Sequence, residues 1–294
     1  MKKLILTGMT ALGLSMGTVA HAGIVGLNLI ESGDNAITDI ASVFNSPDVS
    51  VVSGSEVFSG AQGTGDGAQS AIFDSVAITN GTNTLSLGEG FLLTSGTANL
   101  ASSNTQDQGI DTGTGGDSDL QALATANSLN PNISNVNFFS FDFTLASGFN
   151  AITLDFIFGT EEFPTQTVTD ILGIFVDGVN YAFFPDNSLV NNSSNSPNLI
   201  NNNVDTYDIE YSGLSQVLSL VGLVDENLTT HNLKIAVADT QDVFWDSGVF
   251  VSNLGVANTS TGGITSTTQV SAPHNTLLLA FGAALMFFRL RKKC

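Results

Sequence analysis

Acidic side chains gather in three short stretches of the sequence that are rich in turn-forming residues. The stretches contribute Asp107, Asp111, Asp117 and Asp119; Glu161, Glu162 and Asp170; and Asp239, Asp242 and Asp246. Ca²⁺ binds about six to eight oxygens, many of them carboxylates and loop carbonyls. We therefore predict one or more Ca²⁺ sites, with the candidate ligands Asp117, Asp119, Glu161, Glu162, Asp170, Asp239, Asp242 and Asp246. The alternative is that these carboxylates are solvated or cap turns.

The distribution of charge along the sequence favours the binding of a cation. All 27 acidic residues lie between Glu31 and Asp246, and the only Lys or Arg in that stretch is Lys234. Salt bridges within the body are therefore expected to neutralise few of the carboxylates. A surface of this charge repels nucleic acid and anionic lipid headgroups, so we exclude nucleic acid as a partner.

The body contains few residues that could support an enzymatic function. His231 is the one histidine of the body, in a polar turn that favours a surface or turn-bonding role, and the single cysteine is Cys294. A nucleophilic triad or a zinc site is therefore not expected. Adjacent carboxylates such as Glu161 and Glu162 point to opposite faces of a strand, whereas glycoside hydrolysis needs two facing groups. We predict no enzymatic activity, and a secreted polysaccharide hydrolase is the competing function.

One aromatic residue stands between acidic neighbours. Trp245 lies between Asp242 and Asp246, and an aromatic ring beside carboxylates suits Ca²⁺-assisted stacking on a sugar. The same residue is also a candidate for a buried core position. The sequence is compatible with both a stacking role and a buried core position for Trp245.

The N-terminal end carries the pattern of a secretory signal. Lys2 and Lys3 precede an apolar run, and Ala20-His21-Ala22 supplies the small residues of a cleavage site. We predict a signal peptide over residues 1–22 and an exported body that begins at Gly23. Because Cys294 lies far outside this body, no disulfide is expected to stabilise it.

The C-terminal end carries the pattern of a membrane anchor. Leu277–Phe288 is an apolar run broken only by Gly282 and followed by a basic tail, which the positive-inside rule places in the cytoplasm. Ahead of it, Ser271-Ala272-Pro273 resembles the motif of a PEP-CTERM sorting signal, although Pro-Glu-Pro is usual there. That resemblance implies an exosortase-like processing enzyme. We assign 257–269 as a flexible linker and 270–294 as the sorting motif, helix and tail.

The pattern between the two ends is that of an all-β protein. Short alternating apolar runs recur between turn signals, which predicts one β-sandwich, jelly-roll-like, over residues 23–256. The expected strands lie near 49–58, 71–79, 91–94, 139–145, 152–158, 171–176, 179–183, 207–211, 217–223, 233–237 and 249–254. Two short helices are expected, one opened by Asp34 and one by Asp117.

Four segments together resemble the choice-of-anchor L domain family. They are Gly90–Gly96, Gly116–Leu123, Phe158–Pro164 with Asp170 and Phe175–Gly178, and Ile235–Asp242 with Trp245–Phe250. The resemblance spans roughly residues 49 to 255. It implies a secreted or cell-surface domain with interchangeable anchors, and it implies no established activity.

The combined reading is an exported protein held in the inner membrane by its C-terminal helix and displayed at the cell surface or envelope. We expect a binding or structural role, as an adhesin or matrix component stabilised by Ca²⁺. The expected partners are a glycan or matrix polymer and the sorting enzyme.

Overall fold

The computed structural model describes residues 23–79, 84–100, 109–164, 168–191, 197–202, 207 and 209–267. The predicted signal peptide 1–22 lies outside these residues. So does the predicted sorting segment 270–294, with Ser271, Ala272 and Pro273. Among the described residues, no helix combines the length and the apolar character needed to cross a membrane.

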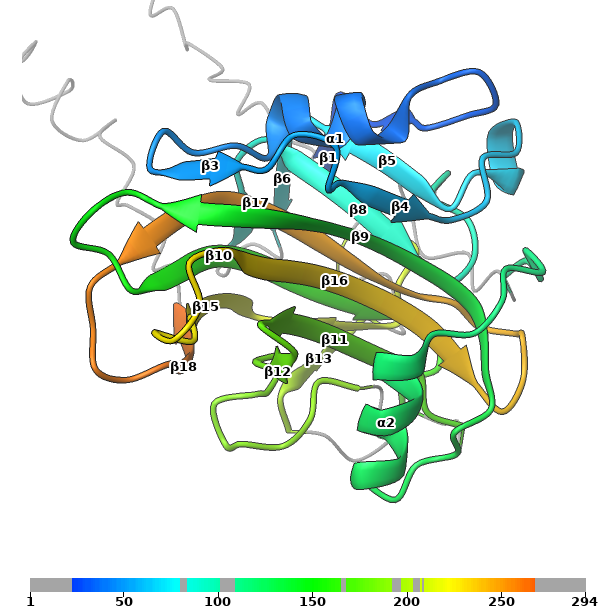
Figure 1. The fold of residues 1–294 in the computed structure, drawn as a ribbon. Helices are drawn as coiled ribbons and strands as arrows, with labels where there is room; N and C mark the ends of the chain where they lie inside the picture. The colour runs from blue at the N-terminus through cyan, green and yellow to red at the C-terminus, as the bar shows by residue number, and fades with distance from the viewer. Residues whose placement is uncertain are drawn as a thin grey trace, which may run out of the picture.

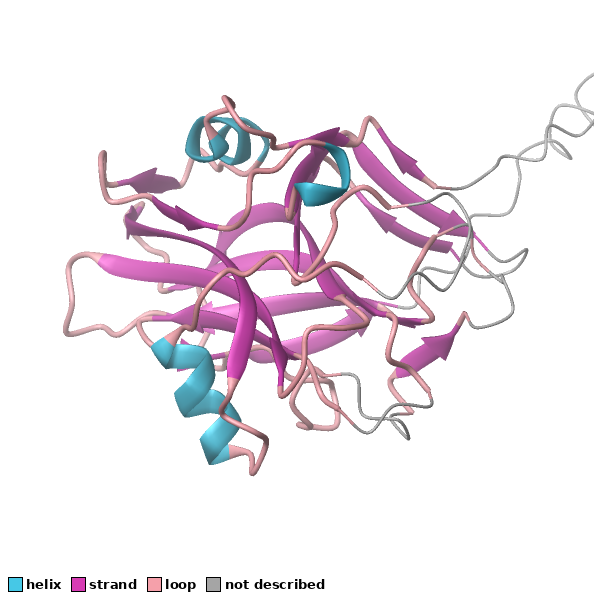
Figure 2. Ribbon diagram, turned by 90° about the vertical axis from the view of Figure 1, so that its right-hand side faces the viewer, coloured by secondary structure: helices cyan, strands magenta, loops and turns pink. Residues whose placement is uncertain are grey.

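Two antiparallel sheets form the body, and strands dominate the chain, with the helices at its periphery (Figures 1 and 2). The six-stranded sheet has the order β12 (Val179–Asn180), β11 (Ile171–Val176), β16 (His231–Thr240), β9 (Ile133–Leu145) and β3 (Val49–Val51), and β4 (Val57–Ser59) also pairs with β9. The nine-stranded sheet has the order β13 (Leu199–Asn201), β14 (Gly213–Ser215), β10 (Ala151–Thr160), β17 (Ser247–Ala257), β8 (Gly90–Thr94), β5 (Ser70–Phe73) and β2 (Asn28–Leu29), and β15 (Val217–Leu223) joins β10 to β18 (Gly263–Thr267). The predicted sandwich of antiparallel strands is confirmed at this level.

Smaller elements complete the fold. A three-stranded sheet contains β1 (Ile24–Val25), β6 (Ser75–Thr79) and β7 (Thr84–Leu87). The helices are α1 (Ala36–Val43), α2 (Ser118–Ala126) and a 3₁₀ turn, η1 (Gly65–Gly67).

The main core lies between the two large sheets. Alternate residues of β9 and β10 face each other there, including the predicted Phe139 and Phe141 of β9 and Phe156 of β10. Helix α1 closes one side of this core, where Phe44 packs edge-on against Phe91 with ring centroids 5.1 Å apart. Each edge contact of this kind contributes about 0.5–1.5 kcal/mol beyond its buried area.

The outer faces of both sheets are also covered. Helix α2 packs on the six-stranded sheet, where Leu120 and Ala124 lie among Ala236 and Ala238 of β16. Small residues on that face let the helix approach closely. A second cluster covers the other face of the nine-stranded sheet and includes Phe250. Strands buried on both faces explain why several apolar runs in the sequence are continuous rather than alternating.

The helix starts were predicted with mixed success. Asp117 caps α2, with its Oδ1 accepting from the backbone N–H groups of Asp119 and Leu120 at 3.0 Å, as predicted. Helix α1 begins one residue later than expected, because Asn35 rather than Asp34 is its N-cap. The Asp34 carboxylate instead accepts from the backbone N–H of Glu31 at 2.8 Å, which closes the preceding turn.

The hairpin between β11 and β12 is confirmed. Asp177 and Gly178 both adopt positive φ angles, 49° and 78°, as a tight two-residue turn requires. The second strand is shorter than predicted and ends at Asn180. There the side-chain Oδ1 of Asn180, rather than a backbone carbonyl, accepts from the N–H groups of Ile174 and Ala182 at 3.0 and 3.1 Å.

The described residues of the segment 207–211 do not form the predicted strand. Tyr207, Ile209 and Tyr211 are buried, but their backbone carbonyls accept from Nδ2 of Asn202 at 3.2, 3.1 and 2.9 Å. The Oδ1 atom of Asn202 accepts from the N–H of Tyr207 at 2.6 Å. One buried amide therefore replaces a strand partner, which an alternating apolar pattern does not reveal.

The predicted linker 257–269 is partly ordered. Its residues 263–267 form β18, which pairs with β15 in the register Val217↔Thr267 to Val221↔Gly263. Ile264 packs against the main core. Backbone pairing and one apolar contact outweigh the Thr, Ser and Gly composition that favoured a flexible segment.

We expect Asn202→Ala to lower the free energy of unfolding by about 2–4 kcal/mol, because it leaves several buried backbone groups unsatisfied. Denaturant titration of the two proteins measures this. The matched control is Asn227→Ala in an exposed turn, which we expect to change stability by less than about 0.5 kcal/mol. Equal effects of the two substitutions would contradict the role given to Asn202.

Candidate functional site

Strand register brings distant acidic stretches together at one end of the sandwich. Thr160 at the end of β10 pairs with Ser247 at the start of β17, and Ile171 at the start of β11 pairs with Ala238 near the end of β16. The β16–β17 turn lies at the right-hand end of the body in Figure 1. The loops at these strand ends carry two of the three predicted acidic stretches. We call Glu161, Glu162, Asp170, Asp239 and Asp246 the carboxylate cluster.

Asp246 is held in a backbone cradle. Its Oδ2 atom accepts from the N–H groups of Thr97 and Ile110, at 3.2 and 3.4 Å. A Cβ atom at Gly96 would lie 1.4 Å from this oxygen, and one at Gly109 would lie 2.3 Å from Oδ1. Two glycines are therefore needed for the carboxylate to fit, and the side chain is 2 % exposed. Sequence reasoning did not predict this cradle, although Gly96 and Gly109 are the residues that could have indicated it.

Asp170 is completely buried at the start of β11. Its Oδ2 atom accepts from the hydroxyl of Ser247 at 2.6 Å. Its Oδ1 atom is buried and has no hydrogen-bond partner among the residues that the structure describes. Burial raises the pKa of Asp170 well above its usual range, and repulsion from Asp239 and then from Glu162 adds to the increase.

Asp239 lies across from Asp170 on β16 and is also fully buried. Its Oδ2 atom accepts from Nδ2 of Asn135 at 2.9 Å, and its Oδ1 atom is buried without a hydrogen-bond partner within the described part of the chain. Burial raises the pKa of Asp239 to about 8. Repulsion from Asp246 contributes to the increase, while interactions with Ser95 and Asn135 oppose it.

Asn135 joins the cluster to the Gly-rich loop before α2. It occupies a break in the β9–β16 register with a φ angle of 50°, which turns its side chain toward Asp239. Its Oδ1 atom accepts from the N–H groups of Thr112 and Gly113, both at 3.1 Å. Sequence reasoning did not predict this role, because an asparagine in a strand pattern has no distinctive spacing.

A buried tyrosine completes the cluster. Tyr211 is fully buried, and burial followed by repulsion from Glu161 and Asp246 raises its pKa. Its ring fits because Gly159 and Gly248 carry no side chain, since Cβ atoms there would lie 2.3 and 2.1 Å from it. Sequence reasoning assigned Tyr211 to a strand and missed this position.

The cluster has no basic side chain to balance its charge. Lys234 and His231 are the only Lys, Arg or His residues between 23 and 267. Both contact carboxylates outside the cluster. The buried groups are therefore neutralised by protons or by a cation from solution.

Asp117 and Asp119 lie away from the cluster, at the start of α2. Both carboxylates contact the ammonium of Lys234, with Asp119 Oδ2 at 2.7 Å from Nζ. The same ammonium lies 4.8 Å from the ring centroid of Phe138. These two predicted ligands are therefore among the few carboxylates that a salt bridge neutralises, because the single lysine of the body contacts both.

The β16–β17 turn carries the aromatic residues. Asp242 is partly exposed and accepts from the N–H of Phe244 at 3.3 Å. Phe244 is 55 % exposed, and Trp245 is half-buried with a φ angle of 57°. Trp245 is thus neither a fully buried core residue nor a free surface residue. A positive φ at tryptophan is uncommon and is retained only where the surroundings hold it.

Asp111, the other described acidic residue of the first stretch, is not part of the cluster. Asp107 lies outside the described residues, and Asp111 is exposed, with Oδ1 accepting from the N–H of Gly113 at 3.0 Å. Within the described ranges, no three Asp, Glu, His or Cys side chains are arranged to hold one metal ion. A cation in the cluster would therefore need neutral oxygens as well as carboxylates.

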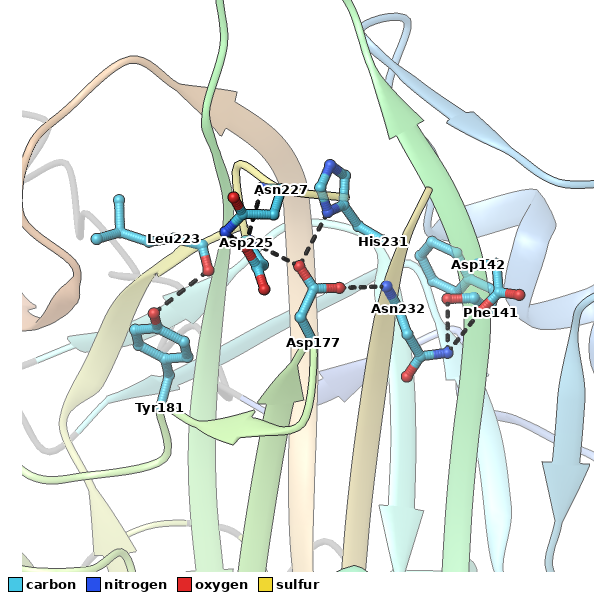
Figure 3. A network of polar contacts seen from close by, with 9 residues as sticks. All are labelled: Phe141, Asp142, Asp177, Tyr181, Leu223, Asp225, Asn227, His231 and Asn232. Atoms are coloured by element: carbon cyan, nitrogen blue, oxygen red, sulfur yellow. Dashed lines mark hydrogen bonds and ion pairs between the residues drawn. The ribbon is translucent and has the colours of Figure 1, made fainter. Parts of the chain in front are cut away.

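The body histidine has a structural role at the opposite end of β16 (Figure 3). His231 Nδ1 lies 2.9 Å from Oδ2 of Asp177, which also accepts from the N–H of Asp225 at 2.8 Å. The other oxygen of Asp177 accepts from the N–H of Asn232 at 2.8 Å. This network joins two turns, as the turn-bonding expectation for His231 proposed, although the ring is buried rather than at the surface.

Comparison with known protein families yields a match. The family model described as the choice-of-anchor L domain matches residues 39–255, a range that contains the whole carboxylate cluster. No curated protein and no solved structure matches the chain.

The raised pKa values predict how stability depends on pH. A buried carboxyl with a folded-state pKa near 8 and an unfolded value near 3.8 binds a proton preferentially in the folded state. Its contribution is complete below about pH 4 and is lost as the pH rises toward 8. In chelator-treated buffer we expect the wild type to lose more than about 1 kcal/mol over this range.

Asp239→Asn removes this titrating group, so we expect its stability to vary less between pH 4 and 8, as measured by urea unfolding at several pH values. Exposed Glu226→Gln is the control and should keep the wild-type profile. An unchanged profile in Asp239→Asn would show that Asp239 ionises normally.

The cradle predicts a steric effect. We expect Gly96→Ala to lower the free energy of unfolding by at least about 1–3 kcal/mol, because the added methyl overlaps the Asp246 carboxylate. Gly115→Ala is the matched control, since a Cβ there meets nothing within 4 Å. Chemical unfolding compares them, and equal stability of the two variants would argue against the cradle.

Proposed function

The chain belongs to the choice-of-anchor L domain family, and from this premise we propose that it is an exported surface protein that binds a glycan or matrix polymer, as an adhesin or matrix component does. Family membership supports an association with the cell surface. The finer role is inferred from the end of the sandwich that carries the carboxylate cluster.

The observation that carries the proposal is the placement of Phe244 and Trp245. They lie on a short turn whose next residue, Asp246, is fixed in its backbone cradle. Gln241 and Trp245 both have positive φ angles, 78° and 57°, so the turn is held in one unusual conformation. Aromatic rings presented in this way lose little conformational entropy when a ligand stacks on them.

The charge of the body narrows the class of ligand. Removing the two predicted end segments leaves one Lys against all 27 acidic residues. An anionic polymer would be repelled by this surface. We therefore favour a neutral polysaccharide that stacks on the turn.

The competing hydrolase reading finds less support in the geometry. The carboxyl groups with raised pKa values, Asp170 and Asp239, are fully buried, where a polymer does not reach them. Glu162 is equally buried. Two-carboxylate glycoside hydrolysis requires both groups beside the scissile bond, so binding without turnover is the function we propose.

The proposed tether comes from the two end segments. We infer that residues 1–22 direct export and that the C-terminal helix initially anchors the chain in the inner membrane. An exosortase-like enzyme would then act near Ser271-Ala272-Pro273. The basic tail and the apolar run beside it support this arrangement.

A glycan array probed with the protein isolated from cells tests the binding proposal. We expect retention on one or more neutral polysaccharides without release of shorter products. Phe244→Ala/Trp245→Ala should weaken that binding by at least about tenfold, which corresponds to about 1.4 kcal/mol of lost stacking. Phe149→Ala, also a partly exposed aromatic but between β9 and β10, should bind as the wild type does.

Three outcomes decide against this proposal. Retention that is unchanged in Phe244→Ala/Trp245→Ala would remove the turn from the binding site. Release of soluble sugar would favour the hydrolase. Absence of retention on every neutral polymer would contradict the ligand class, provided that thermal melting shows the double variant and the wild type to be folded.

Intact-mass analysis of the cell-surface protein tests the tether. We expect a first residue of Gly23 and a C-terminal end that precedes the basic tail. A mass equal to that of residues 1–294 would contradict both the predicted signal peptide and the proposed processing.

A further inference from the structure

We propose that the carboxylate cluster binds one Ca²⁺ ion in the interior of the sandwich, with Asp170 and Asp239 as its two anionic ligands. The site differs from the loop-tip sites expected from sequence, because the ligands come from strand ends and lie beneath the surface. It is independent of glycan binding, which depends on the exposed turn.

The first argument is the pair of oxygen atoms that lack hydrogen bonds. Oδ1 of Asp170 and Oδ1 of Asp239 are both buried, and neither has a hydrogen-bond partner among the described residues. The second oxygen of each group is already used, by Ser247 Oγ at 2.6 Å and by Asn135 Nδ2 at 2.9 Å. A buried acceptor left without a partner is costly, and a cation would satisfy both oxygens at once.

The second argument is the absence of a protein cation. Lys234 is bonded to Asp117 and Asp119, and His231 to Asp177. No other Lys, Arg or His occurs between residues 23 and 267. The groups that donate to Asp170 and Asp239 are neutral, so they satisfy single oxygens without balancing the charge of the cluster.

A shared proton alone is a weaker explanation. One proton could bridge Asp170 and Asp239, but Asp246 also lies in the cluster and accepts from two backbone N–H groups. A single proton would leave one of the two carboxylates, Asp170 or Asp239, ionised, so a net negative charge would remain in the interior, where it is expensive. A divalent cation balances two carboxylates together.

The choice of Ca²⁺ follows from the ligand chemistry. The groups around Asp170 and Asp239 are other carboxylates, the hydroxyls of Ser247 and Ser95 and the amide of Asn135, with no thiolate or imidazole among the described residues of the cluster. Such hard oxygen donors suit Ca²⁺ or Mg²⁺ rather than zinc. Since no three acidic side chains of the described residues are arranged to hold one ion, the shell needs neutral oxygens and water. Ca²⁺ accepts that mixture and irregular geometry, whereas Mg²⁺ demands a near-ideal octahedron.

An ion in this position would connect four strand ends. Asp170 immediately precedes β11, Asp239 lies near the end of β16, and Ser247, which is bonded to Asp170, opens β17 beside β10. These strands belong to both large sheets. Ca²⁺ would therefore join the two layers of the sandwich at one end, where the body has no disulfide available.

The test uses the full-length protein, stripped with EGTA and exchanged into buffer at pH 8. At a free Ca²⁺ concentration of about 100 times Kd, we expect the melting temperature to rise by about 5–10 °C. Isothermal titration should give one ion per chain. Mg²⁺ at the same concentration should raise the melting temperature less.

Asp170→Asn/Asp239→Asn tests the assignment of the ligands. The substitutions keep the size of both side chains and remove their charge, so we expect loss of the Ca²⁺-dependent shift and of the calorimetric signal. Glu226→Gln, an exposed carboxylate at the opposite end of β16, is the matched control and should keep both. Glycan retention measured on the same proteins reports separately on the exposed turn.

Identical melting of the wild type in EGTA and in Ca²⁺, with no heat of binding, would overturn the proposal and leave protons as the neutralising species. Retention of the full shift by a folded Asp170→Asn/Asp239→Asn variant would place the ion elsewhere and also overturn it. If that variant does not fold, the single variant Asp239→Asn is used, and its binding of Tb³⁺ is measured by luminescence. We expect its affinity for the ion to be at least about tenfold weaker than that of the wild type, and an unchanged affinity would overturn the proposal.

Discussion

Repulsion among buried carboxylates is the constraint around which this end of the molecule is organised. Asp170, Asp239 and Asp246 lie in the interior with Glu162, and the basic residues of the body are engaged elsewhere. Like charges in a medium of low dielectric constant interact strongly. The surrounding structure is therefore built from neutral donors, backbone N–H groups and closely fitted glycines, which hold the carboxylates in place without cancelling their charge.

The two-layer scaffold is stable enough to tolerate this arrangement of buried carboxylates. A phenylalanine-rich core between the sheets and apolar cover on their outer faces provide stability that does not depend on the polar end. Long antiparallel strands carry Asp239 and Ser247 to the same end with little freedom in register. Ordered amides such as Asn135 then bind the adjoining loop. Rigidity at the base of the β16–β17 turn and exposure of its aromatic rings are thus two results of one packing arrangement.

Local chemistry explains which parts of the fold could be predicted. The Asp177-Gly178 turn, the Asp117 cap and the alternation in β9 and β10 each depend on residues close in sequence, so their patterns are readable. The Asn202 loop depends on one amide reaching three carbonyls from five to nine residues away. The pairing of β18 depends on a strand more than forty residues distant. The periodic pattern of apolar residues in a sequence does not indicate such long-range contacts.

The sequence by itself determined the acidic character of the body, its antiparallel class and its resemblance to the choice-of-anchor L family, because composition, period and local motifs are properties of short segments. Its eight candidate metal ligands include the five residues of the carboxylate cluster, together with Asp117, Asp119 and Asp242. Only the tertiary structure decided that Asp117 and Asp119 belong to Lys234, whereas Glu162, Asp170, Asp239 and Asp246 meet in the interior. That division follows from strand register, which sets distances between residues far apart in the chain and leaves no mark on the spacing of any one of them.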